Sequence, residues 1–196
     1  MSKVALIMGS LRRPGNGIGI ANWLTPILRK NLDNANVVFV DSTKPPLPLG
    51  PIVDGSHVPA DIRDPTQHPS PKVREFASLI TSCSGFVFLS PEYNGYFSGE
   101  MKNTLDHLYW EWLKKPAVVI TYGGGGGTRA ATQLRGLLEG PFQMKLVEKR
   151  VAIKWPKGAG TVPPEGEAPE WLRRVEPDVL AALEEFNRLL AQNASS

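Results

Sequence analysis

Three segments of the sequence combine glycine with residue types that bind phosphates or aromatic rings. They are residues 9–17 (GSLRRPGNG), residues 90–99 (SPEYNGYFSG) and residues 122–130 (YGGGGGTRA). Hydroxyls, guanidinium groups and unpaired backbone N–H groups donate hydrogen bonds to phosphate oxygens. Tyrosine rings and glycine backbone both suit a flat heterocycle that must be approached closely. Together the three segments predict a site for a planar, phosphorylated ligand.

The first segment lies between an apolar run and an amphipathic stretch, so it leads into a predicted helix N-terminus. Ser10 supplies a hydroxyl and Arg12 a forked cation, which indicates phosphate binding. The alternative is a polar turn with solvated arginines. The Gly-x-Gly-x-x-Gly pattern of dinucleotide-binding proteins, aligned from Gly15, would need a third glycine at position 20, where the chain has Ile20. The Gly-Lys-Ser/Thr sequence of a P-loop is also absent.

In the second segment, Pro91 fixes the chain after an apolar run, and Asn94-Gly95 favours a tight turn with positive φ. The aromatic residues here favour contact with a flat ring over the alternative, a plain surface turn. In the third segment, glycines 123–127 predict close approach of backbone to a planar ligand, the alternative being a flexible linker.

Short, continuous apolar runs alternate along the chain with stretches of helical spacing. The runs predict strands at residues 4–8, 37–40, 86–89, 117–121 and 151–153. Apolar stripes predict helices around residues 20–28, 73–80, 101–112, 131–138 and 179–190, the third of them capped by Ser98. This alternation predicts an α/β fold with a five-stranded parallel sheet and helices on both faces, and the length fits one domain over residues 1–196. Residues 42–70 and 156–169 show no period and are expected to be irregular, the first of them functional or mobile.

Composition narrows the range of functions. The net charge is +3 with no run of Lys and Arg, so no nucleic-acid partner is expected. No apolar stretch is long enough for a membrane span, and the one cysteine cannot form an internal disulfide, so a cytoplasmic protein is expected. Cys83 is expected to be an inert, partly buried thiol at a helix end rather than a nucleophile.

The residue types of acid–base or metal chemistry are few and scattered. The histidines are His57, His68 and His107, and the last is expected to be exposed or interfacial. No Cys and His cluster has metal-ligand spacing, and GSLRR lacks the Gly-x-Ser-x-Gly elbow of a hydrolase. Asp41, at the end of the second predicted strand, is expected to be a turn residue. No catalytic side chain and no metal site is therefore expected.

The motifs GSLR, PEYNG…GEMKNTLDHLYWEW and KPAVVITYGGGGGTRAATQL resemble the NADPH-dependent FMN reductase family over residues 3–155. The resemblance implies a flavodoxin-like three-layer sandwich with strand order 2-1-3-4-5. It also implies an FMN cofactor, NAD(P)H as co-substrate, a small acceptor (a flavin, a quinone or an azo compound), and a homodimer or homotetramer.

The resemblance also implies which residues hold the cofactor. The phosphate loop corresponds to Ser10, Arg12, Asn16, Gly17 and Ile18. The segment that holds the isoalloxazine ring and ribityl chain corresponds to Pro91, Glu92, Tyr93, Asn94 and Gly95, and the loop along the ring edge to Tyr122, Gly123, Gly124, Gly125 and Gly126. The chain departs from the family at Phe97-Ser98-Gly99 and near Asn16. Two alternatives stay open, an electron-carrier flavodoxin and a scaffold that has lost its flavin.

Overall fold

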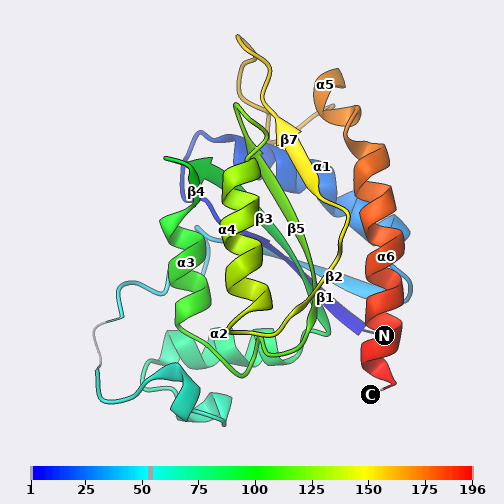
Figure 1. Cartoon of the computed structure of the whole chain (residues 1–196). Coiled ribbons are helices and arrows are strands. Elements are labelled where there is room, and N and C mark those ends of the chain that lie inside the picture. The colour runs from blue at the N-terminus through cyan, green and yellow to red at the C-terminus, as the bar shows by residue number, and fades with distance from the viewer. Residues whose placement is uncertain (1, 53–54, 196) are drawn as a thin grey trace.

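A twisted parallel sheet runs through the centre of the computed structural model, which describes residues 2–52 and 55–195 (Figure 1). Its main strands are β1 (Ser2–Met8), β2 (Ala35–Asp41), β3 (Gly85–Tyr93) and β5 (Pro116–Gly123), in the spatial order β2-β1-β3-β5. All three of these pairings are parallel. The carboxyl ends of the four strands consequently lie at one edge of the molecule.

Two short strands share the position beyond β5. They are β6 (Lys145–Leu146) and β7 (Val151–Lys154), both parallel to β5. A further short strand, β4 (Tyr96–Phe97), pairs antiparallel with the end of β3. The sheet therefore has seven strands rather than the five expected, although the predicted order 2-1-3-4-5 is confirmed. The additional strands β4 and β6 are two residues each, too short to produce a readable pattern.

Helices cover both faces of the sheet. On one face lie α1 (Asn16–Asn31), the short α5 (Glu170–Arg173) and α6 (Glu176–Ala194); on the other lie α2 (Pro71–Thr81), α3 (Gly99–Asp106) and α4 (Thr128–Glu139) (Figure 1). Two separate apolar cores result. Alternate residues of β1 enter one core or the other, which explains why the strand is apolar without interruption. No helix within residues 2–52 and 55–195 is long and apolar enough to cross a bilayer.

The third predicted helix begins as expected and ends early. Ser98 accepts a hydrogen bond from the backbone N–H of Met101, so the predicted N-cap is confirmed. The helix stops at Asp106, however, rather than near Trp112. Trp112 is buried in the turn that follows, where its indole N–H donates to the carbonyl of Leu105. Its burial satisfies the apolar pattern without helical backbone.

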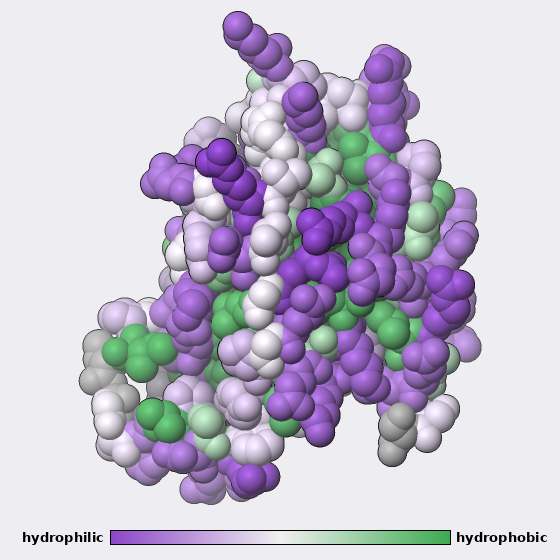
Figure 2. Space-filling model, in the orientation of Figure 1, coloured by the Kyte–Doolittle hydropathy of each residue, from purple (hydrophilic) through white to green (hydrophobic). Residues whose placement is uncertain are grey.

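The long segment between β2 and α2 is irregular, as expected, but its described part is packed. His68 and Glu111 are hydrogen-bonded, with 3.0 Å between Nε2 and Oε1, and both side chains are almost wholly buried. The indole of Trp110 donates to the carbonyl of Ala60 at 2.8 Å. Figure 2 shows apolar side chains gathered at the lower left, where this segment lies in Figure 1. These contacts fix the segment against the chain that follows α3.

Candidate functional site

A cavity of about 550 Å³ lies at the carboxyl ends of β3, β5 and β7, beside the start of α1. This is the edge at which open α/β sheets bind ligands. The predicted site residues that line the cavity come from all three segments and are Asn16, Pro91, Glu92, Tyr93, Tyr122, Gly123 and Gly124. The structure thus brings the three segments together around one space.

Three hydroxyl groups meet beside the start of α1. The Oγ atom of Ser10 lies 3.1 Å from the hydroxyl of Tyr93, and the hydroxyl of Tyr122 lies close to Ser10. Burial is the main cause that raises the pKa of Tyr122 far above its usual value, and the neighbouring Tyr93 adds to this. Tyr122 therefore stays a neutral phenol that can donate a hydrogen bond. The guanidinium of Arg12 lies 4.0 Å from the centre of the Tyr93 ring.

The N-terminus of α1 lies directly against this cluster. No side chain caps it, and its first turn contains no acidic residue. No carboxylate of this turn therefore neutralises the positive end of the helix dipole. A Cβ atom on Gly17 would lie 2.8 Å from the hydroxyl of Tyr122, which explains glycine at this position. The Oδ1 atom of Asn16 accepts a hydrogen bond from the backbone N–H of Val162 at 3.1 Å. Ile18, in the first turn of α1, packs against the apolar core that this helix covers.

The turn after β3 has the predicted conformation. Asn94 and Gly95 have φ values of 52° and 78°, and they connect Tyr93 to Tyr96 in a tight hairpin. Neither turn residue lines the cavity. Their contribution is to end β3 so that Pro91 and Tyr93 form part of the cavity wall.

Glu92 makes a contact that the sequence did not predict. Its Oε2 atom accepts hydrogen bonds from the backbone N–H groups of Arg129 at 3.1 Å and Ala130 at 3.4 Å. Both N–H groups belong to the first turn of α4, where a negative charge is favoured by the helix dipole. Glu92 therefore joins the end of β3, which lines the cavity, to the start of α4.

The glycine run divides into parts with different roles. Gly126 and Gly127 have φ values of 80° and 73°, a backbone conformation that favours glycine whether or not a ligand is bound. Gly123 and Gly124 line the cavity, and a Cβ atom on Gly124 would have no heavy atom within 4 Å. Gly125 is equally open but does not line the cavity. Only two of the five glycines thus border the space that a ligand would fill.

The end of β7 and the residues after it complete the wall, and sequence reasoning missed them. They are Lys154, Trp155, Pro156, Lys157 and Gly158. The backbone N–H of Trp155 donates to the carbonyl of Gly123 at 2.8 Å, which joins this loop to the glycine run. Their position directly after the fifth predicted strand was the signal, because the carboxyl ends of parallel strands lie at one edge.

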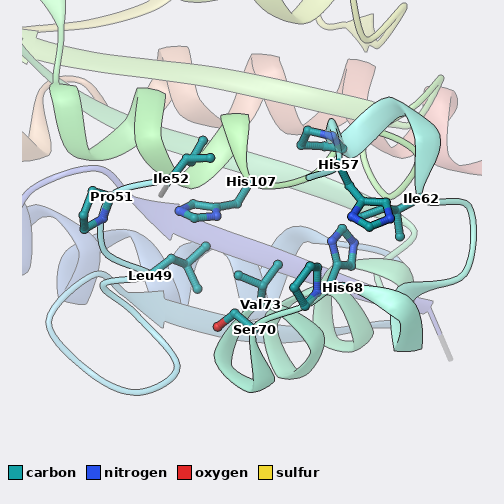
Figure 3. A pocket seen from close by; sticks show the side chains of 11 residues that line it. Leu49, Pro51, Ile52, His57, Ile62, His68, Ser70, Val73 and His107 are labelled. Carbon is teal, nitrogen blue, oxygen red and sulfur yellow. The ribbon is translucent and has the colours of Figure 1, made fainter. Parts of the chain in front are cut away.

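All three histidines lie around a different cavity of about 200 Å³ (Figure 3). It is enclosed by the segment between β2 and α2, the start of α2, and the residue after α3. His107 is half-buried, and its Nε2 atom is 3.0 Å from the carbonyl oxygen of Gly50.

Cys83 is also away from the strand ends; its side chain is 2% exposed, and burial raises the pKa of its thiol. Asp41 forms the expected turn, since its Oδ1 atom accepts from the backbone N–H of Thr43, and it also pairs with Arg13 at 2.8 Å.

Residues 2–155 match the family described as NADPH-dependent FMN reductase. The chain belongs to this family. An NAD(P)H-dependent FMN reductase of Nectria sp. is 33% identical, and the match covers 98% of each chain. An NADPH:quinone oxidoreductase of Arabidopsis thaliana is 31% identical over 68% of this chain and 64% of its own. The flavoenzyme FerB of Paracoccus denitrificans, an NAD(P)H:(acceptor) oxidoreductase, has the same flavodoxin-like fold, with a TM-score of 0.69 at 18% identity over 96% of this chain and 99% of its own.

As a member of the FMN reductase family, the protein is an oxidoreductase that uses FMN and takes electrons from NAD(P)H. The residues present fit this cofactor. The cavity falls within the volume range of small-molecule sites, roughly 300–1,000 Å³. Neutral hydroxyls, a cation and an uncapped helix N-terminus lie beside it, as a phosphate requires, and glycine backbone forms the wall that a flat ring would touch.

Proposed function

We propose that the strand-end cavity holds FMN in one defined orientation. Its phosphate would lie at the first turn of α1, with Ser10 and Arg12 as side-chain donors. Its ring system would lie between the end of β3 and the backbone of Gly123 and Gly124. The observation that carries this proposal is the convergence of the carboxyl ends of β3, β5 and β7 with the start of α1 on one cavity.

Bound FMN supplies the redox chemistry between NAD(P)H and the acceptor. The protein's own residues then have to bind and orient, not to exchange protons. Tyr122, with its raised pKa, offers a hydrogen bond without becoming charged, and Glu92 is held by α4. We infer that the acceptor is a small oxidised molecule such as a flavin, a quinone or an azo compound. The names of the Nectria and Arabidopsis relatives support the first two of these.

Two further features are proposed. The family resemblance favours a homodimer or homotetramer. A reducing, cytoplasmic compartment is supported by the buried thiol of Cys83, the one cysteine of the chain.

The proposed activity can be tested with purified protein loaded with FMN. We expect it to oxidise NADPH or NADH without a second protein and to pass the electrons to free FMN or to a quinone. An electron-carrier flavodoxin would be reduced only when a separate reductase is added. A preparation that neither binds FMN nor oxidises either nicotinamide would support the scaffold alternative and contradict the proposal.

Arg12 provides a more local test of the phosphate position. Replacing Arg12 with alanine should weaken FMN binding by roughly 10- to 100-fold, because a charge-assisted hydrogen bond contributes about 1.5–3 kcal/mol. The measurement is a fluorescence titration of FMN with the protein. Arg29→Ala, an exposed position near the far end of α1, is the matched control. Equal dissociation constants for the two variants would remove Arg12 from the site.

A further inference from the structure

Two lysines, one at the end of β7 and one on the loop after it, line the proposed FMN cavity without a partner. Lys154 and Lys157 are both exposed. Over residues 2–52 and 55–195, neither ammonium group has an ion-pair or hydrogen-bond partner. By contrast, Lys102 and Lys149 are paired with carboxylates at 2.5 and 2.6 Å. The two cations at the cavity are therefore available to a ligand.

The end of β7 and the loop after it, which carry these lysines, are fixed at several points. The backbone N–H of Trp155 donates to Gly123, and its indole N–H donates to the carbonyl of Ala159 at 3.2 Å. The Trp155 ring also packs edge-on against Trp171, with 4.7 Å between ring centres. Because the backbone is held in this way, binding through the lysines would not carry the additional cost of ordering the loop. Figure 2 shows hydrophilic side chains projecting at the top of the molecule, where this loop lies in Figure 1.

The charge balance of the wall favours an anionic ligand. Among the residues that line the cavity, the one carboxylate is that of Glu92, which is already hydrogen-bonded to the first turn of α4. The lysines thus leave the loop side of the cavity positive. The FMN phosphate is placed at α1 by the proposed function, so the lysines are left for a second anionic group.

We propose that Lys154 and Lys157 bind a phosphate group of the nicotinamide co-substrate and so select it at the mouth of the cavity. This inference rests on the proposed function, because the nicotinamide ring must meet FMN in that cavity. NADH carries a pyrophosphate, and NADPH carries the same pyrophosphate with an additional 2′-phosphate. Both groups present the oxygen acceptors that a lysine ammonium binds.

The test compares the double variant Lys154→Gln/Lys157→Gln with the control Lys30→Gln/Lys72→Gln, which removes the same charge at two exposed positions on α1 and α2. NADP⁺ and NAD⁺ are titrated calorimetrically into the FMN-loaded proteins, and KM for NADPH and NADH is measured in parallel. We expect NADP⁺ binding of the double variant to weaken on the order of tenfold, with a smaller effect at high salt. The control should change less than about twofold.

The comparison of the two nucleotides identifies the phosphate group. A loss confined to NADP⁺ assigns the lysines to the 2′-phosphate, and an equal loss for NAD⁺ assigns them to the pyrophosphate. The proposal is overturned if the double variant behaves like the control, or if its affinity for FMN falls by the same factor as its affinity for NADP⁺. FMN titration of the unmodified protein separates the two hypotheses, since failure to bind FMN contradicts the proposed function itself.

Discussion

Replacing Gly124 with valine should weaken FMN binding by roughly 10- to 100-fold, because a branched side chain would occupy the space where the flavin ring meets the backbone. The same substitution at Gly125 should change the dissociation constant by less than about twofold. Gly124 borders the cavity and Gly125 does not, although both have open space where a Cβ atom would go. Quenching of FMN fluorescence by the apoprotein measures both constants.

The comparison depends on both variants folding equally well. Neither glycine has a positive φ, so valine causes no backbone strain of that kind at either position. Thermal unfolding of the flavin-free proteins should therefore give similar midpoints. If the two variants bind FMN equally well, the flavin does not lie against the glycine run, and the proposed ring position is wrong.

The second large effect is expected on stability. Gly19→Ala should lower the free energy of unfolding by about 2 kcal/mol, near the middle of the range for overpacking in a tight core. A Cβ atom at Gly19 would lie 2.5 Å from the carbonyl oxygen of Val162 and 2.8 Å from that of Pro163. Both are backbone atoms and cannot rotate away. Helix α1 and the segment at residues 162–163 would have to separate. Urea denaturation followed by circular dichroism measures the change.

Gly136 provides the matched control, because it is also inside a helix. No heavy atom lies within 4 Å of the position its Cβ would occupy. Gly136→Ala should therefore stabilise the protein by roughly 0.5–1 kcal/mol, through the lower entropy of its unfolded chain. The packing explanation for Gly19 fails if both substitutions stabilise the protein alike.

Much of the fold could be predicted because the apolar pattern of the sequence reflects which side chains are buried. Strands covered on both faces are apolar throughout, as in β1, and the Asn94-Gly95 turn and the Ser98 cap are encoded locally. The end of α3 could not be predicted. Trp112 keeps a helical spacing from Leu105 and is buried in a turn, so its position in the apolar pattern is the same in either conformation.

The candidate site shows the same division. The three segments were recognisable because glycine, arginine and tyrosine occur together at predicted strand ends. The carboxylate of Glu92 was expected near the cofactor, but its partners lie in the first turn of α4, 37 and 38 residues along the chain. Contacts over such a separation have no local pattern. Lys154 and the loop after it were missed because the irregular composition of residues 156–169 concealed that Lys154 pairs with Gly123 at the end of the sheet.

A crystal structure of the protein grown with excess FMN tests the central claim most directly. The prediction is one FMN in the strand-end cavity, with its phosphate at the first turn of α1 beside Ser10 and Arg12, and its ring against Gly123 and Gly124. Flavin bound elsewhere, or a cavity that the protein's own side chains keep closed at saturating FMN, would contradict it.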